Sequence, residues 1–201
     1  GRRLVITASM PQGGTTTLVG NLGLLLAQLD KKVLLVDADM RRPALHGLFG
    51  VERAPGLCEF LRGRQDGQDV VGPTGIDNLS IMPCGVPGGE PADLIGRASE
   101  QRTRMMDLCK AFDYVLVDAA PARFTDPALV ARVMEAPVLL VARAGFTRPV
   151  TVLRSIHKLR EADTRLAGIL LNDFRLPGLI SSAFYRRYAD YHGMQYRYGS
   201  D

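Results

Sequence analysis

The chain has 201 residues, of which 46% are hydrophobic and 23% charged, and its 25 basic and 21 acidic side chains give a net charge of +4. This length and composition predict one compact globular domain and argue against disorder, coiled coil and collagen-like repeats. No apolar run approaches the roughly 18 residues that a membrane-spanning helix needs, and the mild charge does not by itself indicate nucleic-acid binding. Cys58, Cys84 and Cys109 are far apart and odd in number, which fits a reducing, cytosolic setting better than disulfides or zinc.

The first elements along the chain form one strand, helix and strand unit. Residues 4–8 are apolar and rich in β-branched side chains, which predicts a strand. A segment rich in glycine and threonine follows, and leucines then recur at helical spacing, at Leu18, Leu22, Leu25 and Leu29. The apolar run 33–36 predicts a second strand, which ends at Asp37.

The same alternation continues to residue 171. Further strands are predicted at 79–82, 114–117, 138–142 and 166–171, and helices near 92–111, 126–134 and 148–161. The runs VLLVD, YVLVD and VLLVA lack polar alternation, as expected for parallel strands buried on both faces. We therefore predict an α/β fold in three layers, with a mostly parallel sheet flanked by helices on both faces. Residues 54–91, rich in glycine and proline, are predicted to be a peripheral excursion of loops with a short helix.

Two of the buried strands end in an acidic residue. Asp37 follows the second strand and Asp118 follows the strand at 114–117. Ligands of open parallel sheets bind beyond the carboxyl ends of the strands, so these carboxylates are expected to converge near the loop that leaves the first strand. The sequence thereby predicts where a site lies.

That loop, SMPQGGTTT at residues 9–17, has the placement of a phosphate-binding turn. Against the pattern G-x-x-x-x-G-K-[ST], Gly14 fills the second glycine and Thr16 the hydroxyl that would hold magnesium. Ser9 replaces the first glycine and Thr15 the lysine. The plainer alternative is a strand-to-helix turn whose threonines cap the helix.

The second strand continues into DADMRRP, which places Asp37, Asp39, Arg41 and Arg42 just past its end. Carboxylates there could hold magnesium through water or accept a proton, and an arginine could neutralise phosphate charge. The alternative is mutual salt bridging among these four side chains. Their location beside the phosphate-type loop favours the nucleotide interpretation.

Several segments together resemble the bacterial tyrosine autokinases, the cytoplasmic P-loop modules of capsule and exopolysaccharide co-polymerases of the Wzc and CapB type. SMPQGGTTT resembles that family's Walker A loop, VLLVDADMRRP its Walker A′ strand and FDYVLVDAAP its Walker B strand. The segments NLSIMPCG, EPADLI, VLLVARAGFTRP and LND extend the resemblance over nearly the whole chain.

The resemblance implies a parallel sheet between helices and transfer of the ATP γ-phosphate to tyrosines, with ATP or ADP and Mg²⁺ as ligands. Phosphate binding is implied for the loop residues Ser9, Gly13, Gly14, Thr15, Thr16 and Thr17. Magnesium binding is implied for Thr16, Asp37 and Asp118, and a catalytic role for Asp37, Asp39 and Arg41. Asn172 is implied to lie near the adenine.

The end of the chain would supply the acceptors. We divide the chain into a P-loop kinase-like domain at 1–180 and a tyrosine-rich tail at 181–201, with predicted phosphoacceptors at Tyr185, Tyr188, Tyr191, Tyr196 and Tyr198. In the alternative interpretation, the first two of these tyrosines pack beside Phe184 on one helical face.

The resemblance also implies partners and a location. A membrane polysaccharide co-polymerase of the Wzz type, as a subunit or a fused domain, is the expected partner, together with a tyrosine phosphatase and further copies of the chain. No nucleic-acid partner is expected. The module would lie in the cytoplasm at the inner face of the membrane and regulate exopolysaccharide or capsule biosynthesis.

Because Thr15 replaces the lysine of the phosphate-binding loop, the sequence does not decide whether the chain is an active enzyme. The four lysines, Lys31, Lys32, Lys110 and Lys158, lie far from the loop in sequence, and losing one preorganised contact to the transferring group costs about a hundredfold to a thousandfold in rate. The chain is therefore expected to be a weak kinase or a pseudokinase, with Arg41, Arg42 or an arginine of a partner as candidate replacements. Two other functions remain open: a positioning ATPase of the ParA and MinD type, and an interaction module with an empty nucleotide site.

Overall fold

A computed structural model describes residues 2–96 and 101–174 of the chain. The described elements, in chain order, are β1 (Arg2–Ala8), α1 (Thr15–Gln28), β2 (Val33–Ala38), α2 (Leu45–Phe49), α3 (Leu57–Leu61), α4 (Gly67–Val70), β3 (Gly72–Pro73), β4 (Leu79–Met82), α5 (Pro91–Gly96), α6 (Arg102–Cys109), β5 (Tyr114–Ala119), α7 (Asp126–Val133), β6 (Val138–Arg143), α8 (Pro149–Glu161) and β7 (Leu166–Asn172). The predicted acceptors, Tyr185, Tyr188, Tyr191, Tyr196 and Tyr198, lie outside the described residues.

The strands form one sheet in the order β3-β4-β2-β5-β1-β6-β7. Every neighbouring pair is parallel except β3 and β4, which are antiparallel. The three strands β2, β5 and β1 are adjacent, so the loops that follow them leave the same edge of the sheet. The predicted mostly parallel sheet is confirmed.

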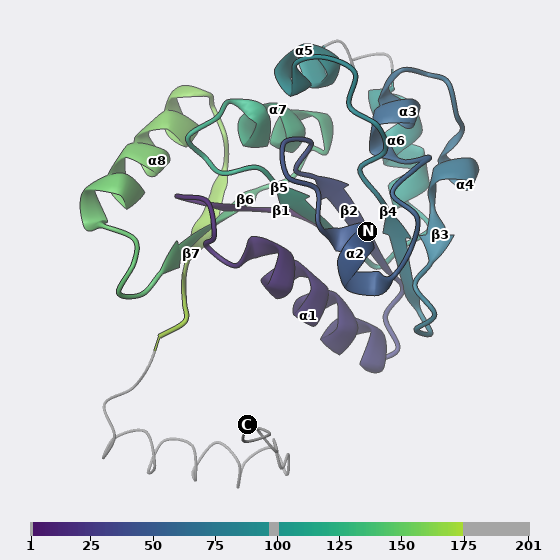
Figure 1. The fold of residues 1–201 in the computed structure, drawn as a ribbon, viewed down its shortest axis with the longest axis horizontal. Coiled ribbons are helices and arrows are strands. Elements are labelled where there is room, and N and C mark those ends of the chain that lie inside the picture. Colours follow the sequence, from purple (N-terminus) through teal and green to yellow (C-terminus); the bar gives the residue numbers. More distant parts are fainter. Residues whose placement is uncertain (1, 97–100, 175–201) are drawn as a thin grey trace, which may run out of the picture.

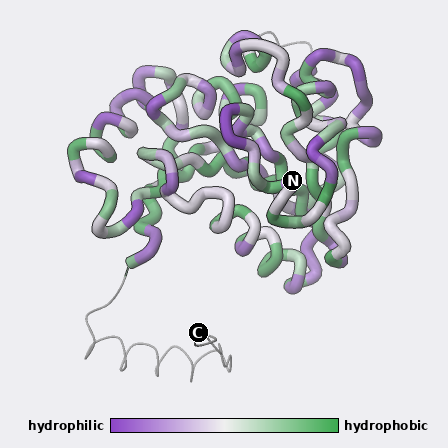
Figure 2. The backbone as a smooth tube through the Cα atoms, in the orientation of Figure 1, coloured by the Kyte–Doolittle hydropathy of each residue, from purple (hydrophilic) through white to green (hydrophobic). Residues whose placement is uncertain are grey.

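Helices cover both faces of the sheet (Figure 1). α1 and α2 pack on one face, where Val19, Ala27 and Leu45 join a buried cluster with β-strand side chains. The helices α3 to α8 contribute to the cluster on the other face. Figure 2 shows the hydrophobic strands in the centre, between helices of mixed hydropathy. The three-layer α/β prediction is therefore confirmed.

Alternation along the strands explains why their sequences are apolar throughout. In β2, Leu34 and Val36 face the cluster of α3 to α8, whereas Val33 and Leu35 face α1. Because successive side chains point to opposite faces and both faces are covered, no position in the strand is left for a polar residue. The first polar side chain, Asp37, appears where the strand reaches the edge of the sheet.

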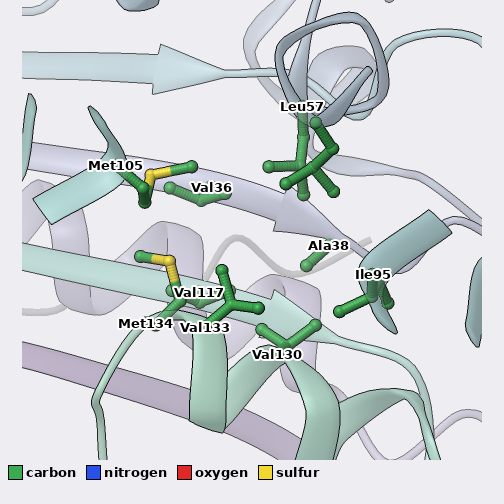
Figure 3. A pocket seen from close by; sticks show the side chains of 10 residues that line it. Val36, Ala38, Leu57, Ile95, Met105, Val117, Val130, Val133 and Met134 are labelled. Atoms are coloured by element: carbon green, nitrogen blue, oxygen red, sulfur yellow. The ribbon is translucent and has the colours of Figure 1, made fainter. Parts of the chain in front are cut away.

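The larger of the two cores contains a small cavity of about 10 Å³. Figure 3 shows its apolar lining, which comes from β2, β5 and the helices α3, α5, α6 and α7. A buried water needs about this much space and two or more polar partners, and this lining offers none. The cavity therefore offers no site for a bound water molecule.

The predictions were less accurate at the periphery. Residues 54–91 contain α3, α4, β3 and β4, which is more regular structure than the predicted loops with one short helix besides the strand at 79–82. Helices of four or five residues make a single turn, so they leave no periodic pattern in the sequence. The helix predicted near 92–111 corresponds to α5 and α6, and residues 97–100 between them lie outside the described part.

None of the helices within residues 2–96 and 101–174 is both long enough and apolar enough to cross a bilayer.

Candidate functional site

The turn between β1 and α1 contains a row of backbone N–H groups without hydrogen-bond partners in the described structure. Gln12 and Gly14 adopt left-handed conformations, with φ of 62° and 86°, and α1 begins at Thr15. In the described part of the chain, no group accepts a hydrogen bond from the N–H groups of residues 13–16. Together with the positive end of the helix dipole, these donors favour an anion such as a phosphate chain.

This turn forms one wall of a cleft of about 540 Å³. The other walls come from the loop after β2, through Asp39, Arg41 and Arg42, and from the loop after β5, through Arg123 and Phe124. The cleft therefore lies at the carboxyl edge of the sheet, where the sequence predicted a site.

Thr16, which lines this cleft, contacts Asp118 of β5. The Thr16 hydroxyl donates to Asp118 Oδ2 at 2.6 Å, and Asp118 lies directly beside Asp37 in the register of β5 and β2. Asp118 Oδ1 is buried and has no hydrogen-bond partner. The expected convergence of the two carboxylates is confirmed.

The unpartnered carboxylate oxygen and the neighbouring hydroxyl fit a magnesium ion. Mg²⁺ in phosphate sites keeps several waters and takes only one or two protein oxygens, with phosphate oxygens completing its shell. Within the described residues there is no group of three or more His, Cys, Asp or Glu side chains that could hold a metal. Thr16 and Asp118 could supply one or two oxygen ligands of such an ion.

Asp37 is fully buried and organises the loop that follows β2. Its Oδ2 accepts hydrogen bonds from the N–H groups of Ala44 and Leu45, both at 3.0 Å, and its Oδ1 accepts from Asp39 N–H at 3.3 Å. These contacts fix the start of α2. The predicted role of Asp37 at the metal stays a prediction, because its oxygens already serve the backbone.

Burial raises the pKa values of the three carboxyl groups near the cleft. The pKa of Asp37 rises to about 6, mainly through desolvation, with a smaller contribution from Asp39. Desolvation also raises the pKa of Asp118 to about 7, against the hydrogen bond from Thr16, and raises that of Asp39. A cation in the cleft would favour the charged carboxylates, so its binding would release protons near neutral pH.

Arg41 turns away from the carboxylates next to it in sequence. Its Nε donates to Asp126 Oδ2 at 2.7 Å, its Nη2 also contacts Glu90, and its guanidinium lies 4.1 Å from the centre of the Phe124 ring. No ion pair in the described structure joins Arg41 or Arg42 to Asp37 or Asp39. The alternative of mutual salt bridging among these four residues was therefore wrong, because Asp126 of α7 supplies the counter-charge.

Asn172 reaches the phosphate-type loop from the last strand. Its Nδ2 donates to the Gly13 carbonyl oxygen at 2.9 Å, and a Cβ atom at Gly14 would approach that Nδ2 to 2.3 Å. Nearby, the buried Ser9 hydroxyl has no partner. The proximity of Asn172 to adenine stays a prediction, whereas its support of the loop is an observed contact.

The structure brings most of the predicted residues together around the cleft. Thr15, Thr16 and Thr17 line it with the two loop glycines, and Asp39 and Arg41 line it from the loop after β2. Asp126, Arg123 and Phe124 were missed. They follow the strand that ends in Asp118, so the reasoning that selected Asp39 could have found them.

The comparisons with known proteins agree with this geometry. A family model described as an AAA domain matches residues 4–157. The chain is 31% identical to the tyrosine-protein kinase wzc of Salmonella typhimurium over 203 residues, which cover 98% of this chain and 26% of that protein. The chain thus spans about a quarter of the length of the curated relatives it matches.

Solved structures give the same result. The kinase domain of the Escherichia coli tyrosine kinase ETK superimposes with a TM-score of 0.78 and 30% identity, covering 88% of this chain and 71% of that one. The Pyrococcus furiosus cell division ATPase MinD has a TM-score of 0.70 at 23% identity, covering 92% and 80% of the two chains. The second likeness shows a shared fold only.

Proposed function

Because the chain belongs to the AAA-domain family, as a P-loop module of the bacterial tyrosine-kinase type, we propose that it binds Mg·ATP in the cleft and serves as the kinase module of an exopolysaccharide-assembly system. The main support for the proposal is that hydrogen-bond donors without an acceptor lie next to a carboxylate oxygen without a donor. The N–H groups of residues 13–16 have no acceptor among the described residues, and beside them the buried Asp118 Oδ1 has no donor. A polyphosphate with its metal ion would satisfy both.

We expect different residues of the cleft to bind the phosphates, bind the metal ion and accept the proton. The loop amides would hold the phosphates, and Thr16 and Asp118 would hold magnesium directly or through water. When bound, the metal ion would neutralise charge on the phosphate oxygens. Asp37 and Asp39 would serve the metal or accept the proton of an incoming tyrosine hydroxyl.

We infer that the γ-phosphate is transferred slowly, to tyrosines within residues 181–201. Thr15 stands at the position of the phosphate-binding lysine and carries no charge. Phosphoryl transfer depends mainly on positioning and electrostatic stabilisation, so losing such a cation leaves a weak kinase or a pseudokinase. The similarity to named tyrosine kinases and the clustering of Tyr185, Tyr188, Tyr191, Tyr196 and Tyr198 support tyrosine as the acceptor.

The relatives are about four times longer than the matched region, so the rest of the system is proposed too. We expect this module to act with a membrane polysaccharide co-polymerase, fused or separate, at the cytoplasmic face of the membrane. Further copies of the chain and a tyrosine phosphatase are the other expected partners.

The direct test incubates the purified chain with radiolabelled ATP and Mg²⁺ and follows phosphotyrosine. We expect slow labelling, and Thr15→Lys should increase it by about a hundredfold to a thousandfold. Asp118→Asn in the Thr15→Lys background is the matched negative control. Failure of both the wild type and Thr15→Lys to bind ATP would contradict the proposal, and ATP-dependent dimerisation with binding to DNA or lipid would favour a positioning ATPase instead.

A further inference from the structure

A cleft built for polyphosphate needs positive charge, and the usual source is missing. Thr15 is neutral, and none of the lysines lines the cleft. Lys158, on α8, donates a hydrogen bond from its Nζ to the backbone carbonyl oxygen of Arg123. The cations that line the cleft are Arg41, Arg42 and Arg123.

Arg41 is already committed to other groups. It pairs with the carboxylate of Asp126, whose side chain is 1% exposed, and also with Glu90. Moving Arg41 to a phosphate would leave a buried carboxylate unpaired, which is strongly unfavourable. Arg41 is therefore a structural link between the loop after β2 and α7.

Arg123 forms no ion pair with a described carboxylate, but its backbone and its guanidinium are both held in place. The preceding residue, Ala122, donates its N–H to the Ala8 carbonyl at 2.8 Å, which ties this loop to the start of the phosphate-type loop. The Arg123 guanidinium lies 4.5 Å from the centre of the Phe124 ring, and Lys158 fixes its backbone carbonyl. In the described structure no carboxylate pairs with this exposed side chain.

Arg42 is the alternative and is less well placed. Its backbone N–H donates to Asp39 Oδ1 at 2.9 Å, but no described group holds its exposed side chain. A guanidinium oriented in advance loses less freedom when it binds an anion and stabilises developing charge more effectively. Stacking and two backbone anchors give Arg123 that advantage.

We propose that Arg123 contacts the terminal phosphate of ATP and supplies, from the loop after β5, the positive charge that Thr15 cannot supply from α1. The loop amides cradle the inner phosphates, and a planar guanidinium matches two oxygens of the outer one. The inference rests on the proposed nucleotide site. It assigns to this chain a substitute phosphate-binding cation at a position outside the Walker A loop.

The test measures binding by calorimetry with a non-hydrolysable ATP analogue and, separately, with ADP, both with Mg²⁺. Arg123→Gln should weaken binding of the analogue by about tenfold to a hundredfold, the range for a lost hydrogen bond to a charged group. Binding of ADP should change by less than about threefold, and Arg123→Lys should recover part of the loss. In the Thr15→Lys background, Arg123→Gln should have little effect, because the lysine then provides the charge.

Arg132→Gln is the matched control, since it removes the same charge from an exposed position on α7 outside the cleft. Equal losses for the analogue and ADP, or a selective loss with Arg42→Gln instead, would overturn the assignment of Arg123. If the wild type binds both ligands and Arg123→Gln changes neither, this inference fails while the proposed nucleotide site stands. If neither the wild type nor Thr15→Lys binds either ligand, the proposed function fails as well.

Discussion

The loops that follow β1 and β2 leave the same edge of the sheet but differ in how far their polar groups are hydrogen-bonded within the protein. Asp37, near the end of β2, accepts three hydrogen bonds from the backbone of the loop that follows. Within that loop, Asp39 Oδ1 accepts from Arg41 and Arg42 N–H at 3.2 and 2.9 Å. In the loop after β1, the N–H groups of residues 13–16 have no acceptor within the described chain. The loop after β2 is thus internally complete, whereas the loop after β1 is complete only with a ligand.

The largest expected effect comes from disturbing the incomplete loop. A Cβ atom at Gly13 would lie 2.5 Å from Ala8 Cβ and 3.3 Å from the Met10 carbonyl oxygen, so Gly13→Ala must displace the loop backbone. We expect the affinity for Mg·ADP to fall by about a hundredfold, because the displaced amides lose one or two hydrogen bonds to charged phosphate oxygens, each worth about 1.5 to 3 kcal/mol. Calorimetry of Mg·ADP binding to the variant and to the wild type measures this loss of affinity.

Gly47→Ala is the control, because a Cβ atom at Gly47 would meet nothing within 4 Å. An affinity of Gly13→Ala within threefold of that of Gly47→Ala would break the distinction between the two loops.

An effect of similar size is expected from the ion pair that Arg41, in the loop after β2, forms with Asp126. Asp126→Ala removes a carboxylate that is 1% exposed and leaves Arg41 without its buried partner, which should lower the free energy of unfolding by about 3 kcal/mol. Glu90→Ala removes the other partner, which is 54% exposed, and should cost less than about 1 kcal/mol. Denaturant titration of both variants compares them, and equal losses would show that Arg41 is not anchored by Asp126.

The smallest expected effect is a pH dependence of the free energy of unfolding, which comes from Asp118 on the strand between β1 and β2. Burial raises the pKa of Asp118 from 3.8 to about 7, so the folded state binds this proton more tightly than the unfolded state does. Its contribution to stability is greatest below about pH 4 and is lost as the pH rises through about 7.

Asp118→Asn removes this pH dependence while keeping an acceptor for Thr16. At pH 8 it should raise the free energy of unfolding by about 2 kcal/mol, or the melting temperature by about 6 °C, because the weaker hydrogen bond offsets part of the gain. The difference should narrow as the pH falls from 8 to 5. A constant difference across that range would contradict the raised pKa.

The sequence was most informative where local pattern and position agree. The apolar runs 33–36 and 114–117 predicted buried parallel strands, and the acidic residue after each predicted the meeting of Asp37 and Asp118, because parallel strands end at one edge. Local pattern, combined with the geometry of parallel sheets, was sufficient for these features.

Contacts between distant segments could not be read from the sequence. Arg41 and Asp126 are 85 residues apart, and Asn172 and Gly13 are 159 apart, so only the assembled sheet brings them together. Only one short helix was predicted between residues 54 and 91, where the structure has α3 and α4, because a single helical turn carries no periodicity. Arg123 is a different case, because its place shortly after the strand at 114–117 is a local signal of the kind that selected Asp39.

The claim that the loop after β1 is completed by a nucleotide is tested most directly by a crystal structure of the chain with ADP and Mg²⁺. We predict the diphosphate on the N–H groups of residues 13–16, with the metal ion beside Thr16 and Asp118. A protein crystallised at saturating Mg·ADP with no nucleotide in this cleft, or with the nucleotide bound elsewhere, would contradict the account.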